Sequence, residues 1–414
     1  MELRRVVVTG IGAVTPIGND VTDFWNSLLT GTNGVGMITH FDTTEYKTKF
    51  ACELKGFDVS KYMDPKEARK VDVCTHYAVA AAVEAMTDAG LSHGTYNPER
   101  AGVVVGAGIG GVATTALDII DFALDNQRPR FSPFFLLKSL NNMMSGNLSI
   151  RFDLQGPSFV TSSACTSAAA ALWDARNMIG LGLCDIMLTG GSEAGIVPFG
   201  IGGFNAMRAL STRNDDIYTA SRPFSIGRDG FVMGEGSGML VLEEYEHAVK
   251  RGAKIYAEIA GIGMTSDAYH VTHPRPDGAG ARKAMELALK EGDVGIDMIP
   301  YVNTHGTSTP LGDASECAAI QALFGDHADT MLFNATKSMT GHLLGAGAAV
   351  ECIATILEMQ NNVVHPTINF EDPDPELPVW DFCIYGPVEC DMEYALCNSF
   401  GFGGHNASIL LKKV

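Results

Sequence analysis

The sequence has 414 residues, of which 46% are hydrophobic and 19% are charged. This length suits two domains or one large duplicated domain, and the composition excludes a disordered chain. The formal net charge of −19 argues against a general nucleic-acid binder and against adhesion to an anionic membrane, because both functions usually require an excess of positive charge.

The cysteines and the N-terminal segment indicate a cellular compartment. The nine cysteines are odd in number and scattered, and they form no CxxC pair, so we expect neither a disulfide framework nor a zinc site. The segment MELRRVVVTGIGAV has no signal-peptide pattern, and we find no run of about 18 uncharged apolar residues that would span a bilayer. We therefore expect a soluble cytoplasmic protein, with its thiols reduced.

The first half of the chain alternates between predicted strands and helices. β-Branched runs bounded by glycine predict the strands, and Ala-rich or capped stretches predict the helices. The expected strands are 5–9, 103–105, one that ends just before Cys165, 185–189 and 237–243; the expected helices are 20–30, with Asp20 or Thr22 as N-cap, 66–90, 135–150 and 166–180.

The second half repeats this rhythm. We expect strands at 256–264, 300–304 and 406–412, and helices at 279–292, 312–324 and 345–360. Alternation in both halves predicts an α/β fold with largely buried sheets. The segments VVVTGIGAVTPIG near the start and AEIAGIGMTSDA near residue 257 are faintly alike, which hints at an internal duplication. No low-complexity linker separates the halves, so we expect them to pack tightly.

Cys165 lies where a predicted strand meets a predicted helix, within TSSACTS (161–167). The N-terminus of a helix stabilises a thiolate, and the small flanking residues leave room for a substrate at the sulfur. Most free cysteines are instead small buried hydrophobes, so the local sequence leaves both interpretations open. None of the other eight cysteines has such surroundings.

Three further segments carry candidate chemistry. His305 in NTHGTSTP (303–310) follows a predicted strand, where α/β sites collect. Lys337 and His342 share TKSMTGHLLGA (336–346), whose Leu and Ala residues predict partial burial. The turn NSFGFGGHN (398–406) can act as a gate or supply a backbone N–H to an oxyanion. Taken singly, each segment is also compatible with an ordinary loop or a solvated face.

Taken together and in this order, the candidate residues match the pattern of a known family, and the chain resembles the elongating β-ketoacyl-acyl carrier protein synthases of type II fatty acid synthesis, with the closest match in the synthase II group. The residues that carry the resemblance are Cys165, His305, Lys337, His342 and the GFGG turn. The resemblance covers essentially the whole chain. The supporting stretches are VVVTGIGAVTPIG near the start, GIGG (108–111), RALSTRND (208–215), RPFSIGRDGFVMGEG (222–236), SDAYHVT (266–272) and HPT (365–367).

The resemblance implies the thiolase fold, a five-layer αβαβα sandwich built from two pseudo-duplicated halves. We expect the N-terminal half, 1–253, to carry the nucleophile, and the C-terminal half, 254–414, to carry the two histidines and the lysine. It also implies a homodimer.

The resemblance implies a two-step condensation of an acyl thioester with a malonyl thioester. Cys165 would hold the acyl chain, and malonyl-acyl carrier protein would then lose CO₂ to give the attacking carbanion. The N–H groups of Cys165 and Phe402 would form one oxyanion hole, and His305 with His342 the other. Lys337 would organise the site, with Glu316 as its partner, and Phe402 would also gate the acyl pocket.

Substrate contacts follow from the same resemblance. Thr307 and Thr309 would bind the phosphopantetheine arm that arrives on the carrier protein, so we expect no cofactor and no required metal. Ile109 would line the far end of the acyl pocket at the dimer interface. Further substrate contacts are expected at Thr272 and Phe400, and a structural monovalent cation can be held near Asn303, Glu351, Asn398 and Ser399.

The expected partner is an acyl carrier protein, which is itself acidic, so a local basic patch must override the net charge of this chain. The positions that match the docking residues of the family are Lys66, Arg69, Lys70 and Arg208. The first three would share one face of the predicted helix 66–90. Without the resemblance, these side chains would simply be a solvated helix face.

Other functions remain to be weighed. A polyketide or specialised-lipid ketosynthase would carry nearly identical motifs. A non-elongating partner subunit would lack the nucleophile, and a thiolase usually needs a second catalytic cysteine near the C-terminus, where Cys383, Cys390 and Cys397 lie. No motif of a cysteine protease is present. One departure from the family pattern is His405, at a position where many relatives carry Thr, which bears on substrate preference.

Overall fold

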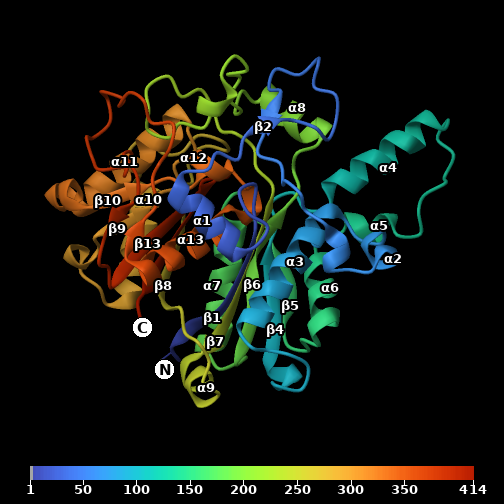
Figure 1. The fold of residues 1–414 in the computed structure, drawn as a ribbon, viewed down its shortest axis with the longest axis horizontal. Coiled ribbons are helices and arrows are strands. Elements are labelled where there is room, and N and C mark those ends of the chain that lie inside the picture. The colour runs from blue at the N-terminus through green and yellow to red at the C-terminus, as the bar shows by residue number, and fades with distance from the viewer. Residues whose placement is uncertain (1–2) are drawn as a thin grey trace.

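The computed structural model describes residues 3–414 and contains one mixed sheet of ten strands (Figure 1). Residues 1 and 2 of the half predicted over 1–253 lie outside the described residues. In spatial order the strands are β10 (Leu332–Asn334), β9 (Tyr301–Asn303), β13 (Tyr394–Gly401), β14 (His405–Lys412), β8 (Ala257–Ser266), β1 (Val6–Val14), β7 (Gly236–Glu244), β6 (Ile186–Glu193), β4 (Ala101–Gly106) and β5 (Ser158–Thr161).

The sheet consists of two halves with the same topology. β1 and β8 are adjacent but share just two paired positions, Val7 with Glu258 and Val8 with Ala257. The sheet can therefore be divided between them into two sets of five strands. From β1 outward the neighbours are β7, β6, β4 and β5, and from β8 outward they are β14, β13, β9 and β10. In both sets the first two pairings are antiparallel and the last two are parallel. The chain therefore has the thiolase fold of two pseudo-duplicated halves.

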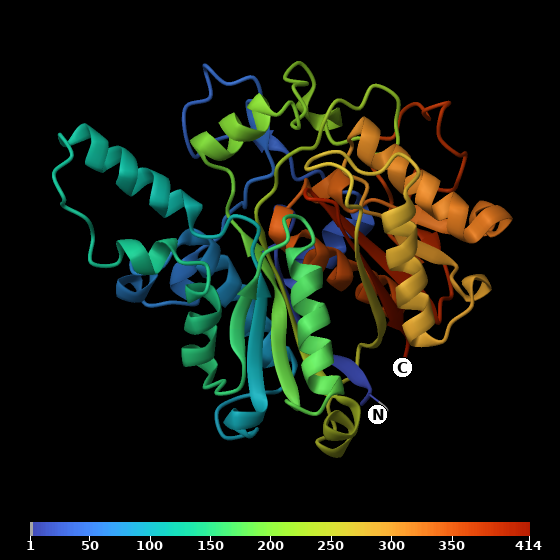
Figure 2. The ribbon, with the colours of Figure 1, turned by 180° about the vertical axis from the view of Figure 1, so that it is seen from behind.

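Helices form the other three layers (Figures 1 and 2). α3 (Val73–Asp88) covers the outer face of the first half-sheet, and α10 (Ala279–Gly292), with α11 (Pro310–Phe324) beside it, covers the outer face of the second. Between the half-sheets lie α7 (Ser167–Gly180) and α13 (Gly347–Asn361). Every residue from Gly347 to Met359 is buried, as expected for a helix covered on all sides.

The remaining elements lie around these layers. The helices are α1 (Val21–Thr30), α2 (Pro65–Ala68), α4 (Val112–Leu124), α5 (Phe135–Ser139), α6 (Met143–Phe152), α8 (Pro198–Ala206), α9 (Tyr245–Lys250) and α12 (Lys337–Thr340). The short strands are β2 (Gly36–Met37), β3 (Phe50–Ala51), β11 (Val363–Val364) and β12 (Val388–Glu389). Short 3₁₀ turns cover Val59–Lys61, Pro98–Arg100, Ile217–Thr219, Ile296–Met298, Gly325–Thr330 and Leu344–Ala346.

The faint similarity of the two GIG segments has a packing reason. A Cβ at Gly12 in β1 would lie 2.0 Å from the carbonyl oxygen of Ala81 in α3, and a Cβ at Gly263 in β8 would lie 1.9 Å from that of Ala284 in α10. In each half the outer helix therefore packs its backbone directly on a strand that has no side chain at this position. The repeated motif marks the same contact in the two halves.

We expect Gly263→Ala to lower the free energy of unfolding by about 3 kcal/mol, the upper end of the cost of overpacking, because the obstacle is helix backbone that no rotamer change can move. Gly146→Ala in α6 is the control, since a Cβ there meets nothing within 4 Å. Urea unfolding followed by circular dichroism measures both. Equal stability of the two variants would show that α10 moves away from β8 at little cost.

Two predicted helices are interrupted in the structure. The helix predicted over 66–90 is wrong as one element, because Asp72 accepts a hydrogen bond from the N–H of Cys74 and caps a new helix, α3. Asp favours such caps over helix interiors. The helix predicted over 135–150 is likewise divided into α5 and α6. In contrast, Asp20 is confirmed as the N-cap of α1, where it accepts from the N–H of Asp23.

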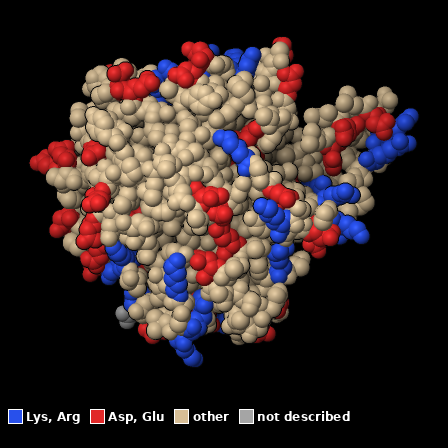
Figure 3. All heavy atoms as spheres, viewed as in Figure 1, with Lys and Arg blue, Asp and Glu red and all other residues tan. Residues whose placement is uncertain are grey.

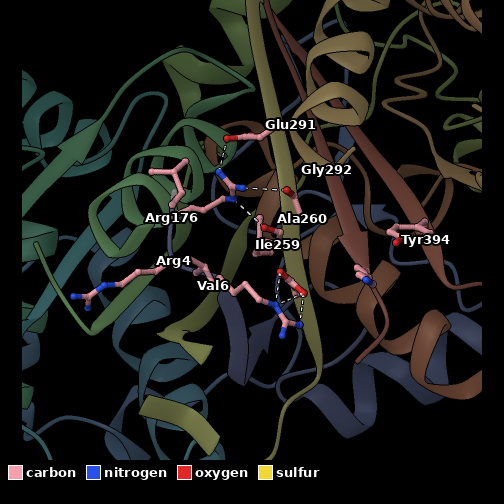
Figure 4. Close-up of a pocket in the computed structure, with 12 residues that line it drawn as sticks. Arg4, Val6, Arg176, Ile259, Ala260, Glu291, Gly292 and Tyr394 are labelled. Atoms are coloured by element: carbon pink, nitrogen blue, oxygen red, sulfur yellow. Dashed lines mark hydrogen bonds and ion pairs between the residues drawn. The ribbon is translucent and has the colours of Figure 1, made fainter. Parts of the chain in front are cut away.

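A buried arginine links the two halves at the end of α7 farther from Cys165 (Figure 4). Arg176 donates to the carbonyl oxygens of Ile259 and Ala260 in β8, at 2.9 and 3.0 Å, and to Glu291 of α10 at 2.6 Å. These contacts border a hollow of about 540 Å³. Because they join α7 to the second half-sheet, they fix the two halves relative to each other. None of the helices in the described part of the chain combines the length and the hydropathy of a membrane-spanning helix.

Candidate active site

Cys165 lies in the turn between β5 and α7 and is 9% exposed. The turn is tight, because the preceding residue, Ala164, has a φ of +53°. Burial raises the pKa of the Cys165 thiol to about 11, although the charge of Lys337 and the N–H groups of Phe402 and Cys165 lower it. The expected stabilisation by the helix N-terminus is therefore outweighed by desolvation, and the resting thiol keeps its proton at neutral pH.

Lys337 holds His305 in one tautomer. Its ammonium group, 1% exposed, lies 2.5 Å from a carboxylate oxygen of Glu351 and 3.3 Å from Nδ1 of His305. An ammonium group can only donate hydrogen bonds, so Nδ1 of His305 must accept and the ring proton must sit on Nε2. Burial and the Lys337 charge hold the pKa of His305 well below its usual range, so the ring is neutral.

The pairing expected between Lys337 and Glu316 is wrong. Glu316 accepts hydrogen bonds from the backbone N–H groups of His305 and Gly306, at 2.8 and 2.9 Å. A carboxylate with these donors fixes the loop that carries His305. Lys337 pairs instead with Glu351, one of the residues expected near a cation. Burial raises the pKa of Glu316 to about 7 and that of Glu351 to about 6.

His342 is buried beside His305 with its ring nitrogens free. The two ring centroids are 5.4 Å apart and the planes nearly perpendicular. His342 is 3% exposed, and neither ring nitrogen has a hydrogen-bond partner among the described residues. Burial is the main cause that holds the pKa of His342 well below its usual range. A buried imidazole without partners is costly, and a bound substrate can supply the missing hydrogen bond.

The hairpin of β13 and β14 contributes residues that lie beside Cys165 and His305. The Ser399 hydroxyl donates to the carbonyl oxygen of Cys165 at 3.2 Å. The Phe400 ring lies 5.6 Å from that of His305, centroid to centroid. Phe402 follows in the glycine turn, and its N–H is one of the groups that lower the pKa of the Cys165 thiol. The hairpin thus brings an aromatic side chain and a backbone donor to the nucleophile.

One cavity of about 500 Å³ joins most of the predicted site residues. It is lined by Ile109, Cys165, Arg208, Thr272, His305, Thr307, Thr309, His342, Phe400 and Phe402, among others. Lys337, Glu316 and Glu351 are buried behind this lining. His405 begins β14 beside Gly403 and is not among the lining residues, although its neighbours Gly404 and Asn406 are.

The basic side chains expected to dock a partner are exposed but do not share one helix. Lys66 lies in α2, Arg69 caps its C-terminus and Lys70 follows, before the Asp72 cap begins α3. Arg208 is exposed at the cavity. Figure 3 shows basic side chains on the side of the molecule that carries α2, α4 and α5. The predicted helix 66–90 therefore does not form as one element, and these three residues lie in α2, at its C-cap and in the turn before α3.

Glu193 is a site residue that the sequence did not single out. It is fully buried at the end of β6 and accepts backbone hydrogen bonds from Gly108, Ile109, Gly110 and Gly345, at 2.7 to 3.1 Å. These donors belong to the loop that carries Ile109 and to the segment after His342. The only sequence signal is a carboxylate at the end of an apolar strand. Glu193 thus ties two walls of the cavity together.

We expect Glu193→Gln to lower the free energy of unfolding by about 1–3 kcal/mol, the cost of leaving buried donors without an acceptor. Each carboxylate oxygen accepts from at least two N–H groups, so the new NH₂ group must face donors in either orientation. Urea unfolding against Glu246→Gln, an exposed carboxylate on α9, measures the effect. A loss no larger than in the control would contradict the bracing role.

Two buried oxygens suit a monovalent cation. Within the part of the chain that the structure describes, Oδ1 of Asn303 and Oε2 of Glu351 have no hydrogen-bond partner, and both residues are among those expected near such an ion. Hard cations prefer carboxylate and amide oxygens. Within residues 3–414 no group of three His, Cys, Asp or Glu side chains is placed to hold a metal ion.

Comparisons with known proteins agree along the whole chain. The family model described as "Beta-ketoacyl synthase, N-terminal domain" matches residues 3–248, and "Beta-ketoacyl synthase, C-terminal domain" matches residues 256–371. The chain is 47% identical to a Vibrio harveyi protein named 3-oxoacyl-[acyl-carrier-protein] synthase 2, over 100% of both chains. It is 46% identical to a Staphylococcus aureus protein of the same name, over 99% of this chain and 98% of that one.

Solved structures show the same fold. A beta-ketoacyl synthase from Burkholderia phymatum has a TM-score of 0.93 and 35% identity, over 99% of this chain and 100% of the other. A chain of a complex described as a type II PKS acyl-carrier protein with its ketosynthase bound to the hexaketide also has a TM-score of 0.93, with 32% identity over 100% of both chains.

Proposed function

The chain belongs to the β-ketoacyl synthase family, and from this membership we propose that its cavity joins an acyl chain, held as a thioester on Cys165, to a malonyl unit. The activity is that of a 3-oxoacyl-[acyl-carrier-protein] synthase of fatty acid elongation. One observation supports the assignment of roles: two neutral imidazoles lie in the same cavity as the thiol, and one of them has no hydrogen-bond partner among residues 3–414.

In the first step the acyl chain moves to Cys165. The sulfur attacks the thioester carbonyl, the bond to the carrier sulfur breaks, and the thiol proton leaves with the carrier thiol. The N–H groups of Cys165 and Phe402 lower the pKa of the thiol in the free site, and we assign them to the oxyanion of the tetrahedral intermediate. A donor of this kind typically lowers the barrier by about 3 kcal/mol.

In the second step a malonyl thioester enters. Its bond to the carboxylate carbon breaks, CO₂ leaves, and the electron pair forms an enolate. We assign Nε2–H of His305 and a ring N–H of His342 as the donors to the enolate oxygen. The enolate carbon attacks the acyl carbonyl and expels the Cys165 thiolate, which takes a proton from solvent. Neutral imidazoles suit this role, because a charged ring would attract the malonyl carboxylate and oppose its loss as CO₂.

The proposal also assigns residues that bind the phosphopantetheine arm of the substrate and the carrier protein. Thr307 and Thr309, whose hydroxyls are 2.9 Å apart in the cavity wall, are assigned to hydrogen-bond the phosphopantetheine arm. An acidic carrier protein would dock on Arg208 and on the exposed Lys66, Arg69 and Lys70. The reaction then requires no further cofactor. A monovalent cation at Asn303 and Glu351, with Asn398 and Ser399 of β13 as further expected ligands, would have a structural role. A cytoplasmic location is part of the same proposal.

A second copy of the chain is the proposed partner at the edge of the sheet. β5 ends the strand order, so one side of its backbone has no neighbouring strand. Exposed apolar side chains occur in α4, α5 and the residues around them. They are Leu117, Ile119, Ile120, Leu124, Phe131, Leu136, Leu137 and Leu140. Apolar surface of this kind favours an interface, and a homodimer would cover it.

A polyketide ketosynthase is the alternative with the same mechanism. The identity of 47% to a fatty acid synthase enzyme, against 32% to the polyketide complex, supports elongation of fatty acids.

The test is a condensation assay read by mass spectrometry. Wild type and Cys165→Ala are each mixed with a medium-chain acyl-acyl carrier protein and malonyl-acyl carrier protein. We expect a 3-oxoacyl product two carbons longer from the wild type and none from the variant. Product from both proteins, or from neither with any chain length tried, would overturn the proposal.

A further inference from the structure

A fully buried polar network lies next to the site residues. Tyr301 and Asn303 belong to β9, which leads to His305, and Asn334 ends β10, just before Thr336 and Lys337. Glu358 of α13 and His365 complete the network. The six members are 0% exposed, and they are Tyr301, Asn303, Asn334, Thr336, Glu358 and His365.

The hydrogen bonds of Tyr301 require one more proton than tyrosine supplies. Its hydroxyl oxygen lies 2.6 Å from Oε2 of Glu358 and 2.7 Å from Oδ1 of Asn334. Two oxygens at such distances need a proton between them, and Tyr301 carries one. An amide oxygen carries none, so the second proton must belong to the carboxyl group of Glu358.

Exchanging the nitrogen and oxygen of the Asn334 amide does not remove the need for a proton on Glu358. The Nδ2 group of Asn334 lies 2.7 Å from Oε1 of Glu358 and 3.1 Å from the carbonyl oxygen of His365. If nitrogen and oxygen were exchanged, the amide oxygen would face Oε1 at 2.7 Å, and this contact would again need a proton on Glu358. The exchanged orientation would also set the NH₂ groups of Asn334 and Asn303 face to face at 3.0 Å, and the Asn334 oxygen against the carbonyl oxygen of His365 at 3.1 Å, so the first orientation is the one adopted. Both orientations nevertheless require the proton on Glu358.

Among residues 3–414, no positively charged side chain faces Glu358. The titratable groups that face it are Tyr301, His365, Cys383 and Cys390. His365 is neutral, because burial lowers its pKa to about 4, and its Nδ1 donates to the carbonyl oxygen of Pro366. Burial likewise raises the pKa of Glu358 to about 8. The charged carboxylate would be an unpaired buried anion.

The network ends at the backbone that carries the site. Nδ2 of Asn303 lies 2.9 Å from the Thr336 hydroxyl oxygen and 3.0 Å from Oδ1 of Asn334. The Thr336 hydroxyl in turn donates to Nε2 of His365 at 3.0 Å. Asn303 is two residues from His305, and Thr336 is the neighbour of Lys337. The contacts therefore couple the two strand ends whose side chains meet at 3.3 Å in the site.

We propose that Glu358 is a neutral carboxylic acid in the folded protein, and that its proton completes the network that positions His305 against Lys337. It is a positioning residue, since it touches neither substrate nor the reacting atoms. Its role in positioning rests on the proposed condensing activity, whereas its protonation does not.

Unfolding experiments test the proton without any assay of activity. A folded-state pKa above the unfolded value of 4.5 means that the wild type loses stability as pH rises from 4.5 to about 8 and no further above it. Glu358→Gln keeps the donor to Tyr301 and the acceptor for Asn334, and it cannot titrate. We expect the ratio of unfolding constants, wild type to Glu358→Gln, to rise toward tenfold per pH unit in this window. Glu389→Gln, an exposed carboxylate in β12, should show no such rise.

Activity tests the positioning role. We expect Glu358→Gln to keep the kcat of wild type and Glu358→Leu to lose about tenfold or more at similar KM, because small displacements of reacting groups cost this much. A flat or falling ratio of unfolding constants would overturn the neutral acid. Equal kcat in Glu358→Leu and wild type would overturn the positioning. An inactive wild type would overturn the proposed function while the unfolding ratio still reports on Glu358.

Discussion

Lys337→Met should abolish most of the condensing activity and also weaken the fold. The ammonium group of Lys337 neutralises the buried Glu351 and fixes the tautomer of His305. Without it, Glu351 must stay as an unpaired buried charge or take up a proton, and breaking such a pair typically costs about 3–5 kcal/mol. His305 would be free to place its proton on Nδ1 and lose its donor to the enolate, at a cost of about 10²–10³ in kcat.

A double variant separates the two effects. Lys337→Met/Glu351→Gln removes both charges, so we expect it to recover much of the stability lost in Lys337→Met but none of the activity. Lys283→Met, an exposed lysine of α10, serves as the control. Urea unfolding and turnover are measured on all three. If the double variant regains activity, Lys337 acts only through the stability of the fold and the tautomer argument fails.

His305→Ala and His342→Ala should each separate the two half-reactions. Both imidazoles are assigned to the enolate oxygen, so each variant should lose about 10²–10³ in the rate of condensation while Cys165 still accepts an acyl chain. Acylation is followed by the mass of the intact protein, and condensation by the 3-oxoacyl product. Loss of acylation in step with condensation would contradict this division of roles.

The same assignment predicts the response to acid. Burial lowers the pKa of His305 and His342 well below the usual range, so both rings stay neutral where an ordinary histidine titrates. We therefore expect neither histidine to cause a loss of condensation rate near pH 6.5, the usual pKa of histidine, so that any loss there comes from Glu316 or Glu351, whose pKa burial raises to about 7 and about 6. Single-turnover rates measured with the preformed acyl-enzyme isolate this step from acylation.

Local patterns predicted much of the fold because they report local chemistry. The β-branched runs gave the strands, and the position of Cys165 between strand and helix followed from composition alone. Asp72 shows the limit, since an N-cap inside an Ala-rich stretch ended one helix and began another. The shared GIG segments became interpretable only when α3 and α10 were seen to pack on them.

Contacts between residues that are far apart in the chain could not be predicted from the sequence. Lys337 pairs with Glu351 rather than Glu316, because the start of α13 brings Glu351 to the ammonium group. The distance of each carboxylate from Lys337 along the chain does not indicate this choice. The roles of Glu193 and Glu358 could not be predicted, since a carboxylate in an apolar element looks the same in the sequence whether its partners are backbone N–H groups or a tyrosine. Their roles depend on hydrogen bonds that only the folded chain defines.

The most direct test of the central claim is the mass of the acyl-enzyme and its location. Wild-type protein is incubated with acyl-acyl carrier protein alone, digested, and analysed by mass spectrometry, and a parallel sample is chased with malonyl-acyl carrier protein. The account predicts one acyl group on the peptide that contains Cys165, and its transfer to a 3-oxoacyl product in the chase. An acyl group on another of the nine cysteines, or one on Cys165 that the chase does not remove, would contradict it.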